Sequence, residues 1–347
     1  MRSATERRNG LIAKKNCGRV FLKQSVIAFM DLLGFSELLK KEPEIASNNM
    51  IAFQNVIKTR FVDDKIYPRD EYECDGALGA SLSFKDEHSV SSFNNMIVFS
   101  DSLVIEADDP DLFIRQLCNY VATVYIEYAE PFAKAFTELE TVKSNRFAAV
   151  TDGELEWKRA FPVLFRGGVA LGNEVFFWDE VCIRKGKMDH NARDVSGRTY
   201  LEAVKLESSG KGPRLFCHEN LVDICGDNYL FSKIDNNIDN KTDENLYEIL
   251  WPVIGCECLQ KSSDVRVNIS NAATKTMLPP AINLLKYYKS RMDLKSVTEH
   301  YSALLDVVIK GILAYGEKHG AKDYAQKIVK EVLKRYGFED YEIMKNM

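Results

Sequence analysis

The sequence predicts an α+β domain followed by a helical C-terminal region. Over the first two thirds of the chain, short apolar runs rich in strand-forming residues alternate with stretches of helical periodicity. Two of the apolar runs end on an aspartate that is followed by a turn, at Asp31 and at Asp101. From Pro279 onward, apolar residues recur at helical spacing. Mixed strands and helices that give way to helices alone are typical of the α+β class.

The composition is that of an ordinary globular protein. The chain has 347 residues, of which 46% are apolar and 28% are charged, and its eight cysteines are scattered without a zinc-type spacing. The formal net charge is −5, so no overall basic field would attract nucleic acid or anionic lipid. No apolar run is long enough to span a bilayer, and the basic N-terminus lacks the apolar core of a secretory signal. We therefore expect a cytoplasmic protein without a nucleic-acid or membrane partner.

The first expected elements place the two aspartates. The run Val26–Met30 is typical of a buried strand; it ends at Asp31, and helical periodicity follows. Residues 62–92 are polar and mixed, which indicates a loop or an insertion. The segment 94–109 predicts two strands joined by a tight turn, with Asp101 at its tip.

The remaining elements follow in order along the chain. We expect a helix over 109–136, a strand interrupted by glycines over 163–177, a short helix over 193–210 and a strand followed by a helix start over 212–222. Segments 229–235 and 246–254 are expected to pair as strands across the polar stretch between them. Gly167 and Gly168 predict close strand packing, and Arg166 predicts a structural salt bridge.

The two aspartates are the strongest chemical signal. If their strands are neighbours, both carboxylates meet at one edge of the sheet, where the like charges repel each other. A divalent cation removes that repulsion, and Mg²⁺ or Mn²⁺ prefers such oxygen ligands while keeping positions open for phosphates. Taken alone, Asp31 is better explained as a helix cap and Asp101 as a hairpin-turn residue. Because each of them follows an apolar run, the metal interpretation is favoured for the pair.

Four stretches resemble the motifs of class III nucleotidyl cyclases, in the order found in that family. The stretch "AFMDLLGFS" is similar to the first metal motif, with Asp31 as the acid, and "FSDSLVI" is similar to the second, with Asp101. The stretch "FRGGVALG" is similar to a glycine-containing strand of the family and carries Arg166 at its arginine. The stretch "DVSGRTYLEAVKLES" is similar to the last motif and begins at Asp194. The resemblance covers residues 24–225.

The resemblance implies a fold and a division of the chain. The fold would be a ferredoxin-like, palm-type antiparallel sheet with helices. The divisions would be an N-terminal arm (1–23), the cyclase-like catalytic domain (24–225), a strand and loop extension (226–278) and a helical C-terminal region (279–347).

The resemblance also implies the parts of a catalytic site. Asp31 and Asp101 would bridge two Mn²⁺ or Mg²⁺ ions, with the Leu32 carbonyl as a further ligand. The triphosphate would be held by the backbone amides of Leu33, Gly34 and Phe35. The family's sites lie between two subunits of a homodimer, so Lys205 would reach across from the other subunit to stabilise charge on the phosphate.

Four positions depart from the family pattern, and a fifth, Asp194, agrees with part of the family. Ser100 stands where the family usually has glycine, and Leu201 stands at the transition-state asparagine. Lys205 replaces the transition-state arginine, which retains the charge but not the forked geometry. Ile97 lies near the position of the lysine that reads a purine base, while Asp194 lies at the base-reading acid of adenylate cyclases.

Metal and phosphate elements without a purine-reading lysine resemble the divergent cyclases of bacterial Pycsar antiphage systems. That resemblance implies conversion of UTP, or next of CTP, to a 3′,5′-cyclic nucleotide and pyrophosphate. Cyclic UMP would then be a second messenger for an effector encoded nearby. Three alternatives remain open: a purine cyclase that uses ATP or GTP, a catalytically inactive nucleotide-binding or regulatory module, and a polymerase-like enzyme. The lack of a basic template groove argues against the last of these.

Overall fold

A computed structural model describes the parts of the chain that form the core. The described residues are 19–21, 24–41, 43–44, 46–47, 50–51, 53, 92–134, 141–142, 158–159, 162–184, 187–234, 245–258, 263–290, 295–339 and 341. Most of the expected insertion, residues 62–91, lies outside them.

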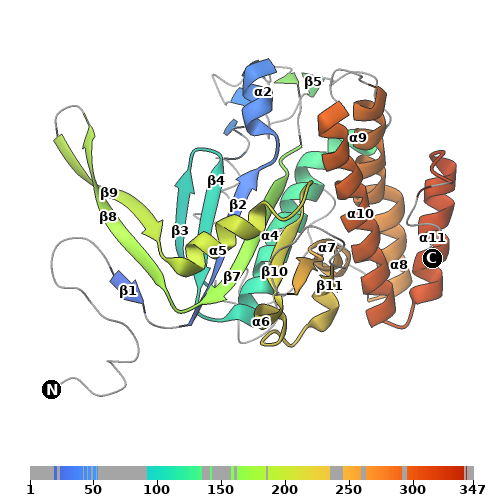
Figure 1. The fold of residues 1–347 in the computed structure, drawn as a ribbon. Coiled ribbons are helices and arrows are strands. Elements are labelled where there is room, and N and C mark those ends of the chain that lie inside the picture. The colour runs from blue at the N-terminus through green and yellow to red at the C-terminus, as the bar shows by residue number, and fades with distance from the viewer. Residues whose placement is uncertain are drawn as a thin grey trace.

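A seven-stranded sheet forms the centre of the fold, in the order β11-β12-β10-β7-β2-β4-β3 (Figure 1). Its strands are β2 (Ser25–Leu32), β3 (Phe93–Phe99), β4 (Ser102–Ala107), β7 (Phe165–Gly172), β10 (Leu215–His218), β11 (Phe231–Lys233) and β12 (Leu246–Ile249). Within this sheet only β7 and β10 run parallel to each other. Two smaller sheets consist of β1 (Arg19–Phe21), β8 (Val175–Arg184) and β9 (Lys187–Ser196), and of β5 (Thr141–Val142) and β6 (Lys158–Arg159).

Helices cover both faces of the central sheet (Figure 1). The α-helices are α2 (Phe35–Lys41), α4 (Pro110–Ala129), α5 (Arg198–Glu207), α6 (Glu219–Val222), α7 (Pro252–Cys258), α8 (Val265–Asn271), α9 (Leu278–Ser290), α10 (Lys295–Lys318) and α11 (Lys322–Arg335). Short segments of other helix types are η2 (Glu130–Ala133), η3 (Asn228–Leu230) and the π-helical η4 (Ala272–Thr276). Helix α5 lies on one face of the sheet, and α4 lies on the other face together with the C-terminal helices. No helix in the described part of the chain combines the length and apolar character needed to cross a membrane.

Strand β2 is buried on both sides because its side chains alternate between two cores. Alternate residues from Val26 to Leu32 pack into the larger core, which includes α4 and the C-terminal helices. Ile27 packs into the smaller core under α5. Asp31 is an even number of residues from Ile27, so it lies on the α5 side of the sheet, at the end of the strand.

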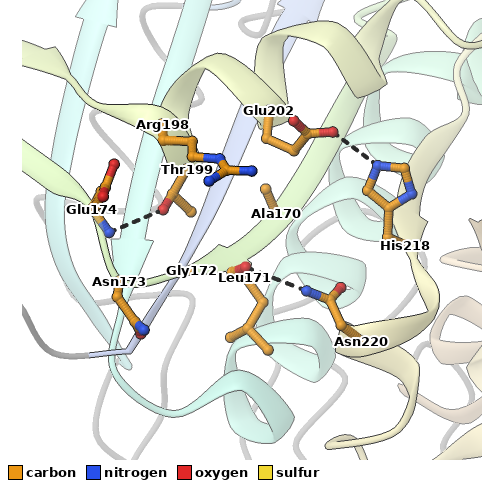
Figure 2. Close-up of a pocket in the computed structure, with 10 residues that line it drawn as sticks. All are labelled: Ala170, Leu171, Gly172, Asn173, Glu174, Arg198, Thr199, Glu202, His218 and Asn220. Atoms are coloured by element: carbon orange, nitrogen blue, oxygen red, sulfur yellow. Dashed lines mark hydrogen bonds and ion pairs between the residues drawn. The ribbon is translucent and has the colours of Figure 1, made fainter. Parts of the chain in front are cut away.

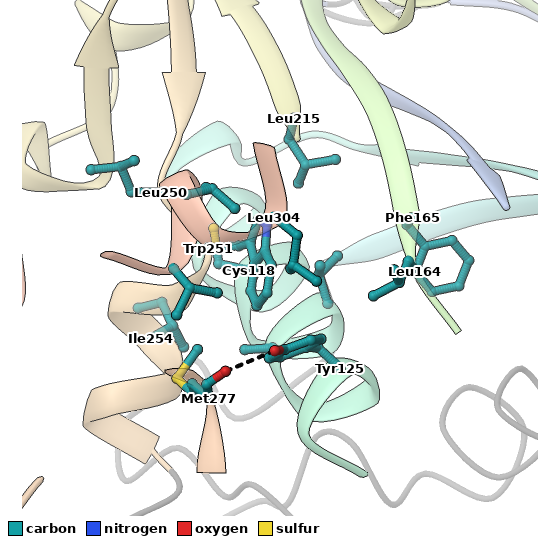
Figure 3. Close-up of a cluster of buried hydrophobic side chains, with 14 of the residues drawn as sticks. Cys118, Tyr125, Leu164, Phe165, Leu215, Leu250, Trp251, Ile254, Met277 and Leu304 are labelled. Atoms are coloured by element: carbon teal, nitrogen blue, oxygen red, sulfur yellow. Dashed lines mark hydrogen bonds between the residues drawn. The ribbon is translucent and has the colours of Figure 1, made fainter. Parts of the chain in front are cut away.

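The larger core joins α4 to the C-terminal helices (Figure 3). The rings of Tyr125 and Trp251 pack edge to face, with their centroids 5.3 Å apart. The Tyr125 hydroxyl donates a hydrogen bond to the Met277 carbonyl oxygen at 2.8 Å, and Trp251 Nε1 donates to the Pro213 carbonyl oxygen at 3.0 Å. Both buried polar groups are therefore satisfied, and the C-terminal helices share one core with the sheet.

Two glycines of β7 allow α5 to lie directly on the sheet. A Cβ atom at Gly168 would overlap the backbone of α5 at Ala203, and one at Gly172 would overlap the side chain of Thr199. The predicted close strand packing is confirmed at Gly167, where a Cβ atom would lie 2.5 Å from the Phe29 carbonyl oxygen of β2, whereas Gly168 makes room for a helix. The close fit determines the distance of α5 from β7, and therefore how near the side chains of α5 lie to the sheet.

The predicted α+β class with a helical C-terminal region is confirmed, whereas two segments are divided differently from the prediction. The segment 163–177 forms two strands, β7 and β8, separated by Asn173 and Glu174, instead of one interrupted strand. The helix expected over 193–210 is limited to α5, because the residues before it complete β9. Gly197 separates the two elements, and its φ of +119° is a conformation that other residues rarely adopt.

Candidate functional site

The two aspartates meet at one edge of the central sheet. Strands β2 and β4 are antiparallel neighbours in which Asp31 is paired with Ser102, the residue that follows Asp101. The Leu32 amide donates a hydrogen bond to the Asp101 carbonyl oxygen at 2.9 Å, so the hairpin turn is attached directly to the end of β2. The predicted proximity of the two strand ends is confirmed.

The Asp31 carboxylate is held by two side chains from its neighbouring strands. Ser102 Oγ donates a hydrogen bond to Oδ1 at 2.9 Å, and Arg166 Nη2 donates to Oδ2 at 3.2 Å. Arg166 also forms an ion pair, through Nε, with Glu207 at the end of α5. The predicted salt bridge of Arg166 is thus confirmed. The sequence reasoning missed Glu207, because its position depends on how α5 docks onto β7.

Burial and neighbouring charges raise the pKa of both carboxylic acids beside Arg166. For Asp31, burial is the largest cause, and the Asp101 charge adds to the rise, while the hydrogen bonds from Ser102 and Arg166 oppose it. For Glu207, burial again raises the pKa, Arg166 opposes it, and the Asp31 charge raises it further. The edge therefore carries a surplus of negative charge that a single guanidinium does not fully neutralise.

The donors at this edge fit a divalent cation that is shared with a substrate. No group of three or more metal-ligating side chains is present among the described residues. Magnesium, however, is usually bound through one or two carboxylates together with substrate phosphates. Asp31 and Asp101 supply that number of carboxylates, and the Asp31 side chain is 19% exposed. The role predicted for the Leu32 carbonyl stays a prediction.

The turn after β2 leaves fewer backbone amides free for a phosphate than the sequence predicted, because the Leu33 amide already has a partner. Leu33 is buried, and its amide donates a hydrogen bond to the Leu164 carbonyl oxygen at 2.8 Å. Gly34 is exposed with a φ of +78°, and Phe35 begins α2. A phosphate at this turn would therefore compete with Leu164 for the Leu33 amide.

Ser100 adopts an uncommon backbone conformation beside Asp101. It is the only described residue other than glycine with a positive φ, +50°. Ser100 and Asp101 form the two-residue turn between β3 and β4, and tight hairpin turns require a positive φ at the first turn position. Glycine adopts such a φ at lower cost, so the turn holds Asp101 at the expense of local strain.

Replacing Ser100 with glycine should stabilise the protein by about 1 kcal/mol, because the strain of a positive φ is removed. Urea unfolding followed by circular dichroism measures the change. The matched control is Ser208→Gly, since Ser208 has an ordinary φ of −82° and its hydroxyl donates to the Lys205 carbonyl oxygen at 2.7 Å. That variant should be destabilised, and equal effects of both changes would contradict the strain argument.

Helix α5 exposes two of the sequence-predicted positions to solvent. The Lys205 side chain is 76% exposed, with Nζ 3.9 Å from a carboxylate oxygen of Glu202. Leu201, one turn earlier on the same helix, is 57% exposed. Neither lies in the Asp31 contact network of its own chain. A lysine and a leucine that share an exposed helix face are accessible to a second subunit.

The two base-reading candidates lie in different environments. Ile97 on β3 is 6% exposed and packs with Val104 and Ile27 in the smaller core. Asp194 on β9 accepts a hydrogen bond from the Val195 amide at 2.7 Å, and its charge, after burial, contributes to raising the pKa of Tyr200. Their roles toward a base stay predictions.

A polar pocket of about 290 Å³ lies at the opposite end of α5 (Figure 2). One wall includes Gly172, which is paired with the first residue of β2, so the pocket is separated from Asp31 by the length of that strand. Inside it, Glu202 Oε1 lies 2.9 Å from His218 Nε2. Arg198 and Glu174 also line the pocket, so its walls carry charges of both signs and do not select a ligand by charge.

Comparison with solved structures finds adenylyl and guanylyl cyclase catalytic domains at low identity. The catalytic core of a rhodopsin-guanylyl cyclase with converted specificity, in complex with ATPαS, gives a TM-score of 0.38 with 10% identity, and the match covers 67% of this chain and 97% of that one. Adenylyl cyclase CyaB from P. aeruginosa gives 0.37 with 12% identity, covering 65% and 93%. The guanylate cyclase domain of RhGC from Catenaria anguillulae, in complex with GTP, gives 0.35 with 9% identity, covering 66% and 96%. No family model and no curated protein matches the chain. With TM-scores below 0.5, the function has to be argued from the residues of this chain.

Proposed function

We propose that the protein is a nucleotidyl cyclase, a phosphorus–oxygen lyase that converts a nucleoside triphosphate to a 3′,5′-cyclic nucleotide and pyrophosphate. The observation that carries the proposal is the pairing of β2 with β4, which brings Asp31 and Asp101 to one edge of the sheet. Two carboxylates beside a glycine turn form a compact site for a metal-bound triphosphate.

Asp31 and Asp101 would hold two Mn²⁺ or Mg²⁺ ions, with the Leu32 carbonyl as a further ligand. Bound there, such ions neutralise charge on the triphosphate and lower the pKa of the attacking 3′-hydroxyl. The chain itself contributes orientation. Ser102 and Arg166 fix the rotamer of Asp31, and the amides of Gly34 and Phe35, with that of Leu33 if it releases Leu164, bind the outer phosphates.

A homodimer completes the proposed site. Because Lys205 and Leu201 face solvent on α5, a second copy could bring this face over the carboxylate edge. Lys205 would then stabilise charge that develops on the α-phosphate during cyclisation. Leu201 offers no hydrogen bond there, so Lys205 is the main group through which this helix face would act.

We propose UTP as the preferred substrate, with CTP next. Ile97 is apolar and almost fully buried, so it supplies no hydrogen bond to a purine. Of the two predicted base contacts, Asp194 is the one whose side chain can accept a hydrogen bond. The proposed product, cyclic UMP, would serve as a messenger for an effector encoded nearby in antiphage defence, and this last step rests on motif resemblance.

Competition among the four triphosphates tests the substrate proposal. With equal concentrations of ATP, GTP, CTP and UTP in one reaction, cyclic UMP should be the dominant product. The reason is that lost polar contacts in a dry pocket can cost about 1–3 kcal/mol, or roughly 5–150-fold in selectivity. Mass spectrometry of the products measures the ratio. Dominant cyclic AMP or cyclic GMP would reject the pyrimidine preference and retain the cyclase.

An inactive nucleotide-binding module is the second candidate, and one contact favours it. Arg166 already neutralises part of the Asp31 charge, which lowers the attraction for a cation. In such a module a triphosphate would bind without turnover. Binding measured by calorimetry, with no product after prolonged incubation, would select this candidate.

A further inference from the structure

The loop between α5 and β10, residues 208–214, touches the candidate site at both of its ends. It begins directly after Glu207, which forms an ion pair with Arg166. It ends at Arg214, whose carbonyl oxygen accepts a hydrogen bond at 3.0 Å from the amide that follows Arg166 in β7. A shift of the 208–214 loop would therefore move Glu207, the ion-pair partner of Arg166, and would also pull on the strand that carries Arg166. The Arg166 guanidinium lies 3.2 Å from Asp31.

Helix α10 of the C-terminal region holds the middle of this loop. His300 Nδ1 accepts a hydrogen bond from the Gly212 amide at 2.9 Å, and Glu299 forms an ion pair with Lys211. Gly212 has a φ of +84°, and a Cβ atom there would lie 2.8 Å from the His300 carbonyl oxygen and 2.5 Å from the Ala303 Cβ atom. The loop and α10 are thus in direct contact, with no space for a side chain between them.

A buried ion cluster fixes the end of the loop to the same helix. Glu248 of β12 is fully buried and accepts hydrogen bonds from Arg214 Nε and, at 2.8 Å, from Lys310 Nζ of α10. Burial acts to raise the pKa of Glu248, but the two cations outweigh it and hold the pKa below its ordinary value. The Glu248 cluster therefore keeps its charges, whereas the His300 contact is an attachment of the loop that protonation removes.

Burial and the charges around His300 together lower its pKa and so favour the neutral imidazole. Burial lowers its pKa most, Arg166 of β7 and Lys211 of the loop lower it further, and Glu299 of α10 opposes them. A neutral imidazole can accept through Nδ1, whereas a protonated one cannot. Protonation would also place a further cation beside Arg166 and Lys211.

We propose that His300 is a positioning residue for the candidate site: its Nδ1 acceptor holds the 208–214 loop against α10, and the loop holds Arg166 against Asp31. The helical C-terminal region then contributes to the geometry of the site from outside the motif-bearing domain. The effect on turnover rests on the proposed function, but the effect on the strand of Arg166 does not.

Two substitutions separate the acceptor of His300 from its bulk. His300→Asn places an amide oxygen near the position of Nδ1 and cannot be protonated in this range, whereas His300→Leu keeps volume and removes the acceptor. The matched control is His319→Leu, near the far end of α10, where His319 Nε2 lies 3.7 Å from Glu257. Melting temperatures establish that each variant is folded, and His300→Asn keeps the test usable if His300→Leu does not fold.

Hydrogen–deuterium exchange, corrected for intrinsic rates, is measured on peptides covering 208–214 and 165–172 at about pH 7.5 and at a series of lower pH values, since burial lowers the pKa of His300. In the wild type, both segments should exchange faster once His300 is protonated. His300→Leu should exchange fast throughout the series, His300→Asn slowly throughout, and His319→Leu like the wild type. If His300→Leu loosens 208–214 alone, or if His300→Asn behaves like His300→Leu, the proposal is wrong.

Turnover supplies the functional readout. We expect His300→Leu to lower kcat about tenfold with a nearly unchanged KM, as for a group that positions the reacting site. His300→Asn should retain activity and lose the acid limb of the pH profile. If the wild type shows no turnover, the proposed function fails, while the exchange data still decide the role of His300.

Discussion

Asp31→Ala and Asp101→Ala are each expected to lower cyclic-nucleotide formation by at least about 100-fold, even with saturating Mn²⁺. The reason is that each change removes a ligand shared by both metal ions, and electrostatic stabilisation of this kind is usually the largest single contribution to such a reaction. Initial rates of pyrophosphate release measure the loss. The matched control is Asp223→Ala, an exposed aspartate after α6, which should retain full activity.

Removing the charge of Asp31 should stabilise the fold although it abolishes activity. Because burial and Asp101 raise the pKa of Asp31, its ionised form costs folding free energy above the pKa of an unfolded aspartate, about 4. Asp31→Asn should therefore raise the melting temperature at pH 7 by about 2 °C, and the gain should disappear as the pH falls toward that value.

Retention of more than about a tenth of the wild-type rate in either alanine variant would contradict the two-metal assignment.

Lys205→Ala should slow the reaction by about 100-fold or more while leaving triphosphate binding nearly unchanged. The expectation follows from a cation that is used mainly in the transition state and is solvent-exposed in its own subunit. Steady-state kinetics and calorimetric binding of a non-hydrolysable triphosphate measure the two quantities. The matched control is Lys322→Ala at the start of α11, whose partner Glu317 is also exposed and which lies outside the proposed site.

Mixing the inactive variants tests where Lys205 acts. An Asp31→Ala subunit still supplies Lys205, and a Lys205→Ala subunit still supplies both aspartates, so the mixed dimer contains one intact site. We expect activity to reappear on mixing, up to about a quarter of the wild-type level for random subunit exchange. Exchange confirmed by native mass spectrometry, with no recovery of activity, would show that the site is not shared between subunits.

The carboxylate edge could be predicted because its signal is local. An apolar run that ends on an acid and a turn is visible in a dozen residues, and Asp31 and Asp101 each carry it. The hairpin of β3 and β4 follows from its two-residue turn, whereas the pairing of β2 with β4 joins residues 71 positions apart and entered the sequence analysis only as a condition. The amide of Leu33 was less predictable, since the segment that contains its acceptor, Leu164, is far away in sequence.

Glu207 and His300 could not be predicted, because tertiary docking places them. Glu207 reaches Arg166 only because Gly168 lets α5 approach β7 closely. His300 lies 88 residues after Gly212, the loop residue that it contacts. Neither position has a spacing or a neighbouring motif that marks it in the sequence. Similarly, the beginning of α5 depended on the extent of β9, whose pairing with β8 no local pattern indicated.

Product identification tests the central claim most directly. The purified 347-residue protein is incubated with UTP and Mn²⁺, and the products are identified by mass spectrometry alongside a pyrophosphate assay. The account predicts a monomeric 3′,5′-cyclic nucleotide, formed with one pyrophosphate for each molecule, in the wild type and not in Asp31→Ala. Linear oligomers, or the absence of turnover with any of the four triphosphates from folded protein, would contradict it.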